Sequence, residues 1–231
     1  MSEYVYLNFP VQIMQGGFTD VKAVCSKAID YGIYDFMLRN GLSGVNGFGE
    51  ALKELQLTCK NHAGGLKVSK DIYQQLKDSL EKPVTVSIKK DLLFEYFKNE
   101  KSEFEIAVFL GYVGLKSIIG KKPYIKITND YLLARMFGYS SVIELKKDFS
   151  AECCKYSTRY HLDKVKTKLE SSFGLKLYGQ KTRGFYVSFK LSLLDLVYHA
   201  ELKRESRKEK ERKAEKSDTI NQVLNHFKSK K

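Results

Sequence analysis

Cationic and hydroxyl-bearing side chains gather between residues 155 and 183, and their chemistry suits a phosphate polyanion. Leu162, Val165 and Leu169 fall within about 60° of one another at about 100° per residue, so they predict the buried face of a helix from Ser157 to Ser172. The helix and its approach carry the polar candidates Lys155, Ser157, Arg159, Tyr160, His161, Lys164, Thr167 and Lys168. Lysine and arginine pair with phosphates or guanine edges, and hydroxyls mostly contact phosphates. An ordinary solvated helix face is the alternative.

The residues after this helix predict a short hairpin with a basic tip. Apolar side chains alternate between Leu175 and Phe189, and Gly179 and Gly184 supply turn flexibility. Between these glycines lie the remaining candidate binding residues, Gln180, Lys181, Thr182 and Arg183. A plain basic turn is common on any surface, but this one directly follows the basic helix. This position favours a binding role for its two cations, Lys181 and Arg183.

Several upstream elements must hold the helix and hairpin in place. A strongly apolar helix begins at Ser102, and Tyr124–Ile127 supplies a short strand. Another helix is capped by Thr128 and closes on Gly138. The segment that follows, to Phe149, is longer than a minimal turn and can hold a short helix of its own, capped by Ser141.

This order of elements resembles the winged-helix branch of the helix-turn-helix proteins over about residues 102–189. The resemblance implies that the second motif helix enters the major groove of double-stranded DNA and that the hairpin grips the backbone. It also implies that the twelve candidates named above are the DNA-binding residues. The long segment before the second helix departs from the family pattern, which leaves the angle between the two motif helices open.

The charge of the chain is concentrated where these elements lie. Of the net charge of +13, residues 1–150 contribute only +3, with 20 basic and 17 acidic residues. Residues 151–231 contribute the other +10, with 20 basic and 10 acidic residues. A basic surface attracts phosphate polyanions without sequence preference. The gradient therefore favours the C-terminal part as the side that faces nucleic acid, although excess lysine can also serve solubility.

Length and composition allow one large or two small domains with a packed core. The polar cluster at residues 98–103 is the best boundary. We expect an α+β, predominantly α-helical chain with three parts. A smaller helix-rich domain with short strands occupies residues 1–100, a winged helix-turn-helix domain residues 101–198, and a charged helical tail residues 199–231.

Within the first part, a capped helix should start at Thr19 or Asp20 and continue to Leu38. The glycines between residues 41 and 49 predict a flexible loop, and residues 61–65 predict a second turn. Ser69 can cap the helix after that turn. The N-terminal part could be a degenerate first copy of the winged helix, but its second hairpin strand is missing from the sequence.

The tail begins with a helix whose charges alternate in sign over residues 203–216, which favours exposure through i,i+4 pairs. Ser217 and Asp218 should break this helix. Beyond the break, apolar residues from Ile220 to Phe227 form a stripe that could dock on a partner. A homodimer or a protein partner through this 218–228 segment or through the N-terminal domain is therefore an open possibility.

The sequence gives no indication of a membrane or secreted protein. No apolar run approaches the roughly 20 residues that span a bilayer. The N-terminus lacks the basic start and apolar middle of a secretion signal. The four cysteines show no framework spacing, so reduced thiols and a cytoplasmic location are expected, without a membrane partner.

Catalysis and cofactor binding are not indicated. Cys59 and His62 have ligand-like spacing, but no second pair lies nearby to complete a zinc site. The glycine-rich segment after Gly41 lacks the Gly-Lys-Ser/Thr that cradles phosphate. The four histidines are scattered, and none lies beside a plausible nucleophile. We expect no enzyme activity, no cofactor and no metal.

Two hypotheses of different classes remain. In the first, the chain binds duplex DNA as a transcriptional regulator or as the replication initiator of a mobile element. In the second, the winged helix is a protein-docking module in a larger assembly, without direct DNA readout. Steep salt dependence of DNA binding would separate the two.

Overall fold

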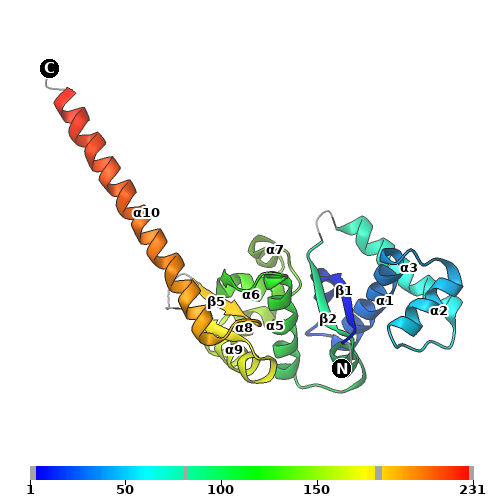
Figure 1. The fold of residues 1–231 in the computed structure, drawn as a ribbon. Coiled ribbons are helices and arrows are strands. Elements are labelled where there is room, and N and C mark those ends of the chain that lie inside the picture. Colours follow the sequence, from blue (N-terminus) through cyan, green and yellow to red (C-terminus); the bar gives the residue numbers. More distant parts are fainter. Residues whose placement is uncertain (1–3, 81–82, 180–183, 229–231) are drawn as a thin grey trace.

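A computed structural model describes residues 4–80, 83–179 and 184–228, without the side chains of residues 210 and 219–228 (Figure 1). Over these residues the chain is mainly α-helical with two small antiparallel sheets, which confirms the expected α+β, predominantly helical class. The N-terminal half contains β1 (Tyr6–Pro10), the 3-10 turn η1 (Val11–Met14), α1 (Val21–Arg39), α2 (Gly44–Glu54), α3 (His62–Ser79), β2 (Thr85–Lys89) and α4 (Lys90–Lys98). The remainder contains α5 (Glu103–Ile119), β3 (Ile125–Ile127), α6 (Asn129–Met136), α7 (Val142–Lys147), α8 (Ala151–Ser157), α9 (Arg159–Phe173), β4 (Lys176–Tyr178), β5 (Phe185–Ser188) and α10 (Leu193–Lys228).

The N-terminal half is built around α1, which packs on α3, α4 and β1. Asp20 caps this helix by accepting a hydrogen bond from the Ala23 amide at 2.8 Å, as expected. Before this helix, β1 ends at Pro10, because the chain turns into η1 directly after it. β1 pairs with β2 in antiparallel register, with Leu7 opposite Ile88.

Three expectations for this half were wrong. The glycine-rich segment is a loop only over residues 41–43, because α2 begins at Gly44. The turn at residues 61–65 is the start of α3, capped by the Asn61 side chain. Ser69 does not cap a helix but lies buried in the middle of α3.

Close packing explains why glycine occupies these helical positions. A Cβ on Gly47 would lie 3.0 Å from the Leu42 carbonyl carbon, and one on Gly65 would lie 3.0 Å from the Phe48 ring. A helical glycine costs about 1 kcal/mol relative to alanine, but here it lets neighbouring segments approach closely. Tertiary contact therefore overrides the local preference for a turn.

The centre of the C-terminal half is α5, which begins next to Ser102 as expected, and Ser102 forms a full capping box with Glu105. Two glycines allow neighbouring helices to approach it. A Cβ on Gly111 would lie 3.1 Å from a Val165 methyl of α9, and one on Gly114 would lie 3.0 Å from the α6 backbone. This close packing explains why α5 is apolar almost all round.

The strands of this half form one sheet in the order β3-β5-β4, with Leu177 and Ile125 both opposite Val187. Upstream, Thr128 caps α6 and Ser141 caps the short helix α7, as predicted. The second motif helix does not start at Ser157, because that residue ends α8. Thr158 adopts an extended conformation and its side chain caps α9, which separates the two helices. Gly174 closes α9 with φ 66°, a left-handed conformation that glycine adopts readily.

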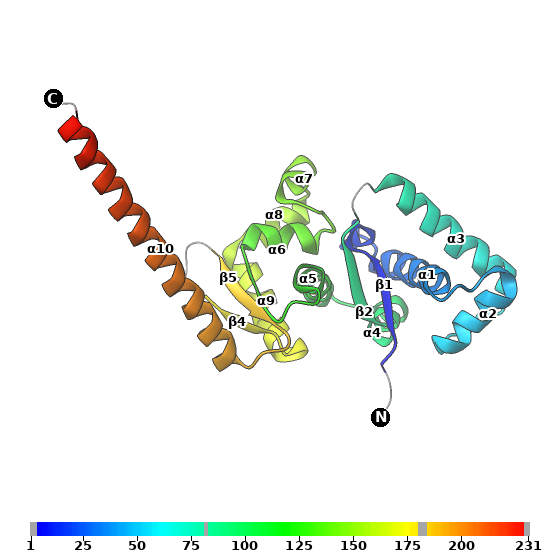
Figure 2. The same cartoon turned by 45° about the horizontal axis from the view of Figure 1, so that its top comes forward.

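The last element, α10, is a single helix that projects from the body (Figures 1 and 2). The expected break at Ser217 and Asp218 is wrong. Each of these residues disfavours a helix by no more than about 0.7 kcal/mol. Nearby i,i+4 ion pairs such as Arg207–Glu211 at 2.8 Å stabilise the helix instead. The predicted apolar stripe from Ile220 to Phe227 has its backbone in α10, and its side chains lie outside the described part.

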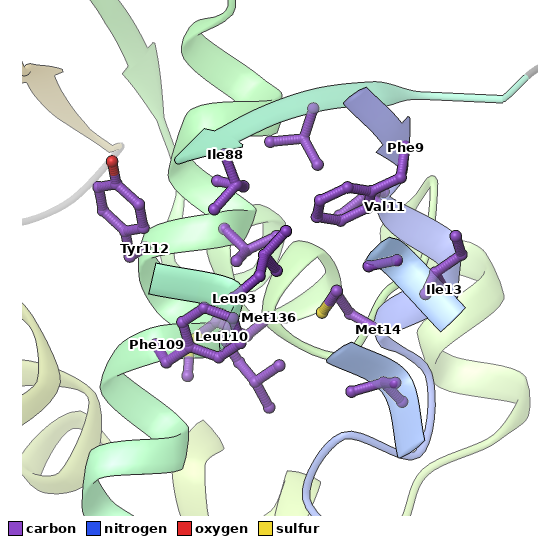
Figure 3. Close-up of a cluster of buried hydrophobic side chains, with 14 of the residues drawn as sticks. Phe9, Val11, Ile13, Met14, Ile88, Leu93, Phe109, Leu110, Tyr112 and Met136 are labelled. Atoms are coloured by element: carbon purple, nitrogen blue, oxygen red, sulfur yellow. The ribbon is translucent and has the colours of Figure 1, made fainter. Parts of the chain in front are cut away.

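The buried core runs without interruption from one half of the chain to the other. Figure 3 shows Phe9 and Ile88 of the N-terminal sheet in the same cluster as Phe109 of α5 and Met136 of α6. Aromatic stacking adds to this contact, since the Phe18 and Phe137 ring centroids are 4.6 Å apart. The division into residues 1–100, 101–198 and 199–231 stays a prediction, and the first two parts pack as neighbours.

Candidate nucleic-acid interface

The apolar face of α9 is fixed against α5 and α8. Leu162, Val165 and Leu169 are all buried, as the helical spacing predicted. The opposite face therefore points away from the core, and its residues Tyr160, Lys164, Thr167 and Lys168 are exposed. These four residues are called the α9 strip below.

The α9 strip borders a shallow hollow of about 470 Å³. Phe104 of α5, Asp163 and Ser171 complete its lining. Tyr160 is 64% exposed, and the ammonium of Lys164 lies 4.2 Å from its ring centroid. This cation–π contact holds the Lys164 side chain along the helix surface, where its charge faces solvent. The strip thus presents two amines, a phenol and a hydroxyl to one approaching surface.

Other candidate cations beside the strip are paired with carboxylates. The ammonium of Lys155, on α8, lies 2.8 Å from both carboxylate oxygens of Glu103. This hydrogen bond lowers the pKa of Glu103, to which Tyr156 also donates a weaker bond. Pairing of this kind reduces the positive potential at the end of α9 nearest α8.

Arg159 also has an acidic partner, since its Nε lies 3.3 Å from Asp163 one turn further along α9. Lys166 binds the other oxygen of the same carboxylate at 2.9 Å. Partial burial raises the pKa of Asp163, but the bonds from Lys166 and Arg159 outweigh it, and the net shift is downward. The Arg159 side chain is still 80% exposed, so a phosphate could compete for it.

Ser157 and His161 make contacts within the protein. The Ser157 hydroxyl donates to the Cys154 carbonyl at 2.7 Å. His161 is half-buried, its Nδ1 lies 2.8 Å from the Thr158 hydroxyl, and its ring meets that of Tyr156 edge-on. These contacts shape the junction between α8 and α9.

The hairpin adjoins α9, but its tip is not described. Gln180, Lys181, Thr182 and Arg183 all lie outside the described residues. At the base, a Cβ on Gly179 would lie 2.7 Å from the Phe185 Cα, so only glycine allows the strands to approach this closely. A second hollow of about 530 Å³ lies between this base, the start of α6 and the flank of α9 that carries Arg159 and Lys166.

Sequence reasoning missed three residues of this surface. Asp163 and Lys166 escaped notice because they lie on the flank of the helical wheel, between the buried and exposed faces. Their i,i+3 spacing was the signal for an ion pair. Phe104 was assigned to a buried helix, yet it is 38% exposed. Its place in the first turn of α5, directly after the capping residue and the acidic Glu103, could have indicated this exposure.

Other classes of site receive no support within the described residues. No cluster of three or more His, Cys, Asp or Glu side chains there could hold a metal ion. Nor does any helix in the described ranges combine the length and the apolarity needed to cross a membrane. Cys59 is half-buried, and its thiol donates to the Asn61 carbonyl at 3.3 Å. No family model, curated protein or solved structure matches this chain.

Proposed function

We propose that residues 102–189 form a winged helix-turn-helix domain that binds double-stranded DNA. In this proposal the α9 strip enters the major groove and the hairpin between β4 and β5 contacts the flanking backbone. The protein would act as a transcriptional regulator or as the replication initiator of a mobile element. The observation that carries the proposal is the exposed α9 strip beside a sheet of order β3-β5-β4.

The topology supports this proposal. The first strand of the motif, β3, pairs with the last, β5, so the hairpin is fixed to the start of α6 and stands beside α9. Two short helices, α7 and α8, lengthen the connection between α6 and α9, and Thr158 redirects the chain between α8 and α9. The recognition helix thus begins at Arg159, which places Arg159, Tyr160 and Lys164 in its first two turns. The first turns of such a helix contact base edges in this class of protein.

The distribution of charge also supports the proposal. Lys164 and Lys168 lie one turn apart on the exposed face, with Thr167 beside them. Amines in this position approach the phosphates that flank a groove, and each neutralised phosphate releases condensed counterions. Binding should therefore weaken steeply as salt rises.

The test compares two double charge reversals. Lys164→Glu with Lys168→Glu should abolish measurable duplex binding, whereas Lys67→Glu with Lys70→Glu, an exposed pair on α3, should leave it nearly unchanged. The wild-type protein should show a negative slope of log affinity against log salt, of about −0.9 for each phosphate contacted. Fluorescence anisotropy with random-sequence duplex measures both quantities, and circular dichroism checks folding. Equal losses from the two pairs would refute the assignment of α9.

A second candidate function is protein docking through the same surface. Phe104 and Tyr160 expose aromatic rings on either side of the hollow, and Glu103 and Asp163 neutralise neighbouring cations. Aromatic anchors are typical of protein interfaces. Absence of duplex binding by the wild-type protein at low salt would favour this candidate over DNA recognition.

A further inference from the structure

The outward face of α10 carries large apolar side chains that nothing in the chain covers among the described residues. Leu194 is 82% exposed, Tyr198 62% and Leu202 45%. Residues two apart on a helix point in nearly opposite directions, at about 200°. Leu196 and Ala200, two positions from these residues, are buried where α10 packs on β4 and β5. Leu194 and Tyr198 therefore face away from the body, and Leu202 lies at the edge of this face, where it also borders a hollow between α10 and the sheet.

The same face continues along the whole of α10 with an ordered pattern of residue types. Positions that fall within about 80° of one another, at about 100° per residue, follow on from Leu194 to position 227. We call them the α10 stripe: Leu194, Tyr198, Leu202, Glu205, Glu209, Arg212, Lys216, Ile220, Val223 and Phe227. Along the chain, the stripe begins with three apolar residues, continues with two acidic and then two basic residues, and ends with three apolar residues. The last three positions are placed by sequence spacing alone, since their side chains lie outside the described part.

The α10 stripe is symmetric about its centre, between residues 210 and 211, to within one residue. If a second copy of the helix lies antiparallel, each position meets another position of the stripe. The facing pairs are Leu194 with Phe227, Tyr198 with Val223, Leu202 with Ile220, Glu205 with Lys216, and Glu209 with Arg212. Apolar residues thus meet apolar residues, and carboxylates meet cations. In a parallel pair each glutamate would face its own copy, which is repulsive.

We propose that two copies of this chain associate through the α10 stripe as an antiparallel helix pair. The occupant of the exposed face is a second α10, because its order of charges is the complement that the stripe requires. Lys213 on the same helix binds one carboxylate oxygen of Glu209, at 2.7 Å, and a cation of the partner helix would add to this pair. The ends contribute apolar burial, and the charged centre fixes orientation and register.

An antiparallel arrangement would place the two bodies at opposite ends of the helix pair. The two Leu194 positions would lie about 50 Å apart, from a rise of about 1.5 Å per residue. This distance exceeds one turn of duplex, which is about 34–36 Å. If the proposed DNA binding holds, the dimer suits two separated half-sites or two duplexes. Only this consequence rests on the proposed function, and the dimer does not.

The test uses charge reversal on the full chain with mass measured by light scattering. The wild-type protein should have about twice the chain mass of 26.6 kDa at tens of micromolar. Glu205→Lys with Glu209→Lys should weaken the dimer at least about tenfold, because like charges then face each other. Glu211→Lys with Asp218→Lys makes the same charge change on the opposite side of α10 and should leave the dimer intact. A monomeric wild type would overturn the proposal.

A complementary variant makes the test independent of any effect on folding. Arg212→Glu with Lys216→Glu should also weaken the homodimer. When this variant is mixed with Glu205→Lys, Glu209→Lys, four attractive pairs return, so a heterodimer of doubled mass should form. Failure of the mixture to dimerise would overturn the proposal, as would a dimer unaffected by either variant, which would indicate a different interface. Duplex binding is measured separately by fluorescence anisotropy, so failure of the dimer proposal and failure of the DNA proposal can be distinguished.

Discussion

The α9 strip and the α10 stripe are both lysine-bearing helix surfaces that face solvent, but their charges are ordered differently. The charged side chains of the α9 strip are all cations, accompanied by two neutral hydroxyls, and the opposite face of the helix is buried. The α10 stripe carries two acidic positions followed by two basic ones, with apolar residues at each end. A strip of one sign suits a polyanion of uniform charge. A stripe whose halves complement each other suits a second copy of itself.

This comparison shows that the amount of charge says little about the partner. Residues 191–231 hold 11 basic and 7 acidic residues, more cations than residues 151–190, which hold 9 basic and 3 acidic. Yet ion pairs within α10, such as Lys213–Glu209 and Arg207–Glu211, neutralise much of that charge locally. The net charge gradient along the sequence therefore combines two different surfaces. The positions of the charged residues around each helix distinguish the two surfaces.

The largest expected effect is on stability, because the helix under the α9 strip is packed in the core whereas the α10 stripe is exposed. Leu169→Ala removes a fully buried side chain beneath the α9 strip and should lower the free energy of unfolding by about 2–5 kcal/mol. Leu194→Ala, at an exposed position, should change it by less than about 0.5 kcal/mol and should instead weaken the dimer. Denaturant unfolding and light scattering measure the two effects. Equal stability losses would contradict the separation of the surfaces.

The sequence predicted the elements with strong local signals and failed where packing decides. Helical spacing placed the buried face of α9, and caps at Asp20, Thr128 and Ser141 were identified because a side-chain oxygen directly precedes a helical pattern. The sequence did not predict that the glycines of α2 and α3 are helical, because glycine is needed there only for close packing. Gly47 packs against Leu42, which lies just before α2, and Gly65 packs against Phe48 of another helix.

The candidate site was predictable in outline but not in its ion pairs. The exposed positions of the α9 strip follow from the helical period alone. Pairing of Lys155 with Glu103 joins residues 52 positions apart, so it depends on how α5 and α8 pack. The boundary at Thr158 was missed because a single extended residue between two helices has no strong sequence signal other than its capping side chain.

A smaller effect is expected at Tyr160, which sharpens the comparison between DNA and protein partners. Tyr160→Ala removes an exposed ring and its contact with Lys164, and should reduce duplex affinity by about 1–2 kcal/mol. Tyr160→Phe keeps the ring and should lose only the part due to the hydroxyl. Anisotropy titrations at matched salt measure both variants. An unchanged duplex affinity of Tyr160→Ala would show that Tyr160 does not contact the DNA.

The smallest expected effect concerns Glu103, whose pairing with Lys155 neutralises the end of α9 nearest α8. Because the bond from Lys155 lowers the pKa of Glu103 in the folded protein, the pair stabilises the fold above the ordinary pKa of 4.5. That contribution is lost as the pH falls through the lowered folded value. The pair is exposed, so Glu103→Gln should cost less than about 1 kcal/mol at neutral pH and close to nothing in acid.

The same substitution tests whether Lys155 belongs to the DNA-facing surface. With Glu103 neutral, Lys155 is available to a phosphate, so Glu103→Gln should raise duplex affinity slightly and steepen its salt dependence by up to one contact, about 0.9 in the slope. Glu144→Gln, on α7, removes the same charge away from α9 and serves as the control. An unchanged slope would place Lys155 among the structural cations of the α8–α9 junction, and would confine the DNA-facing surface to the α9 strip and the hairpin.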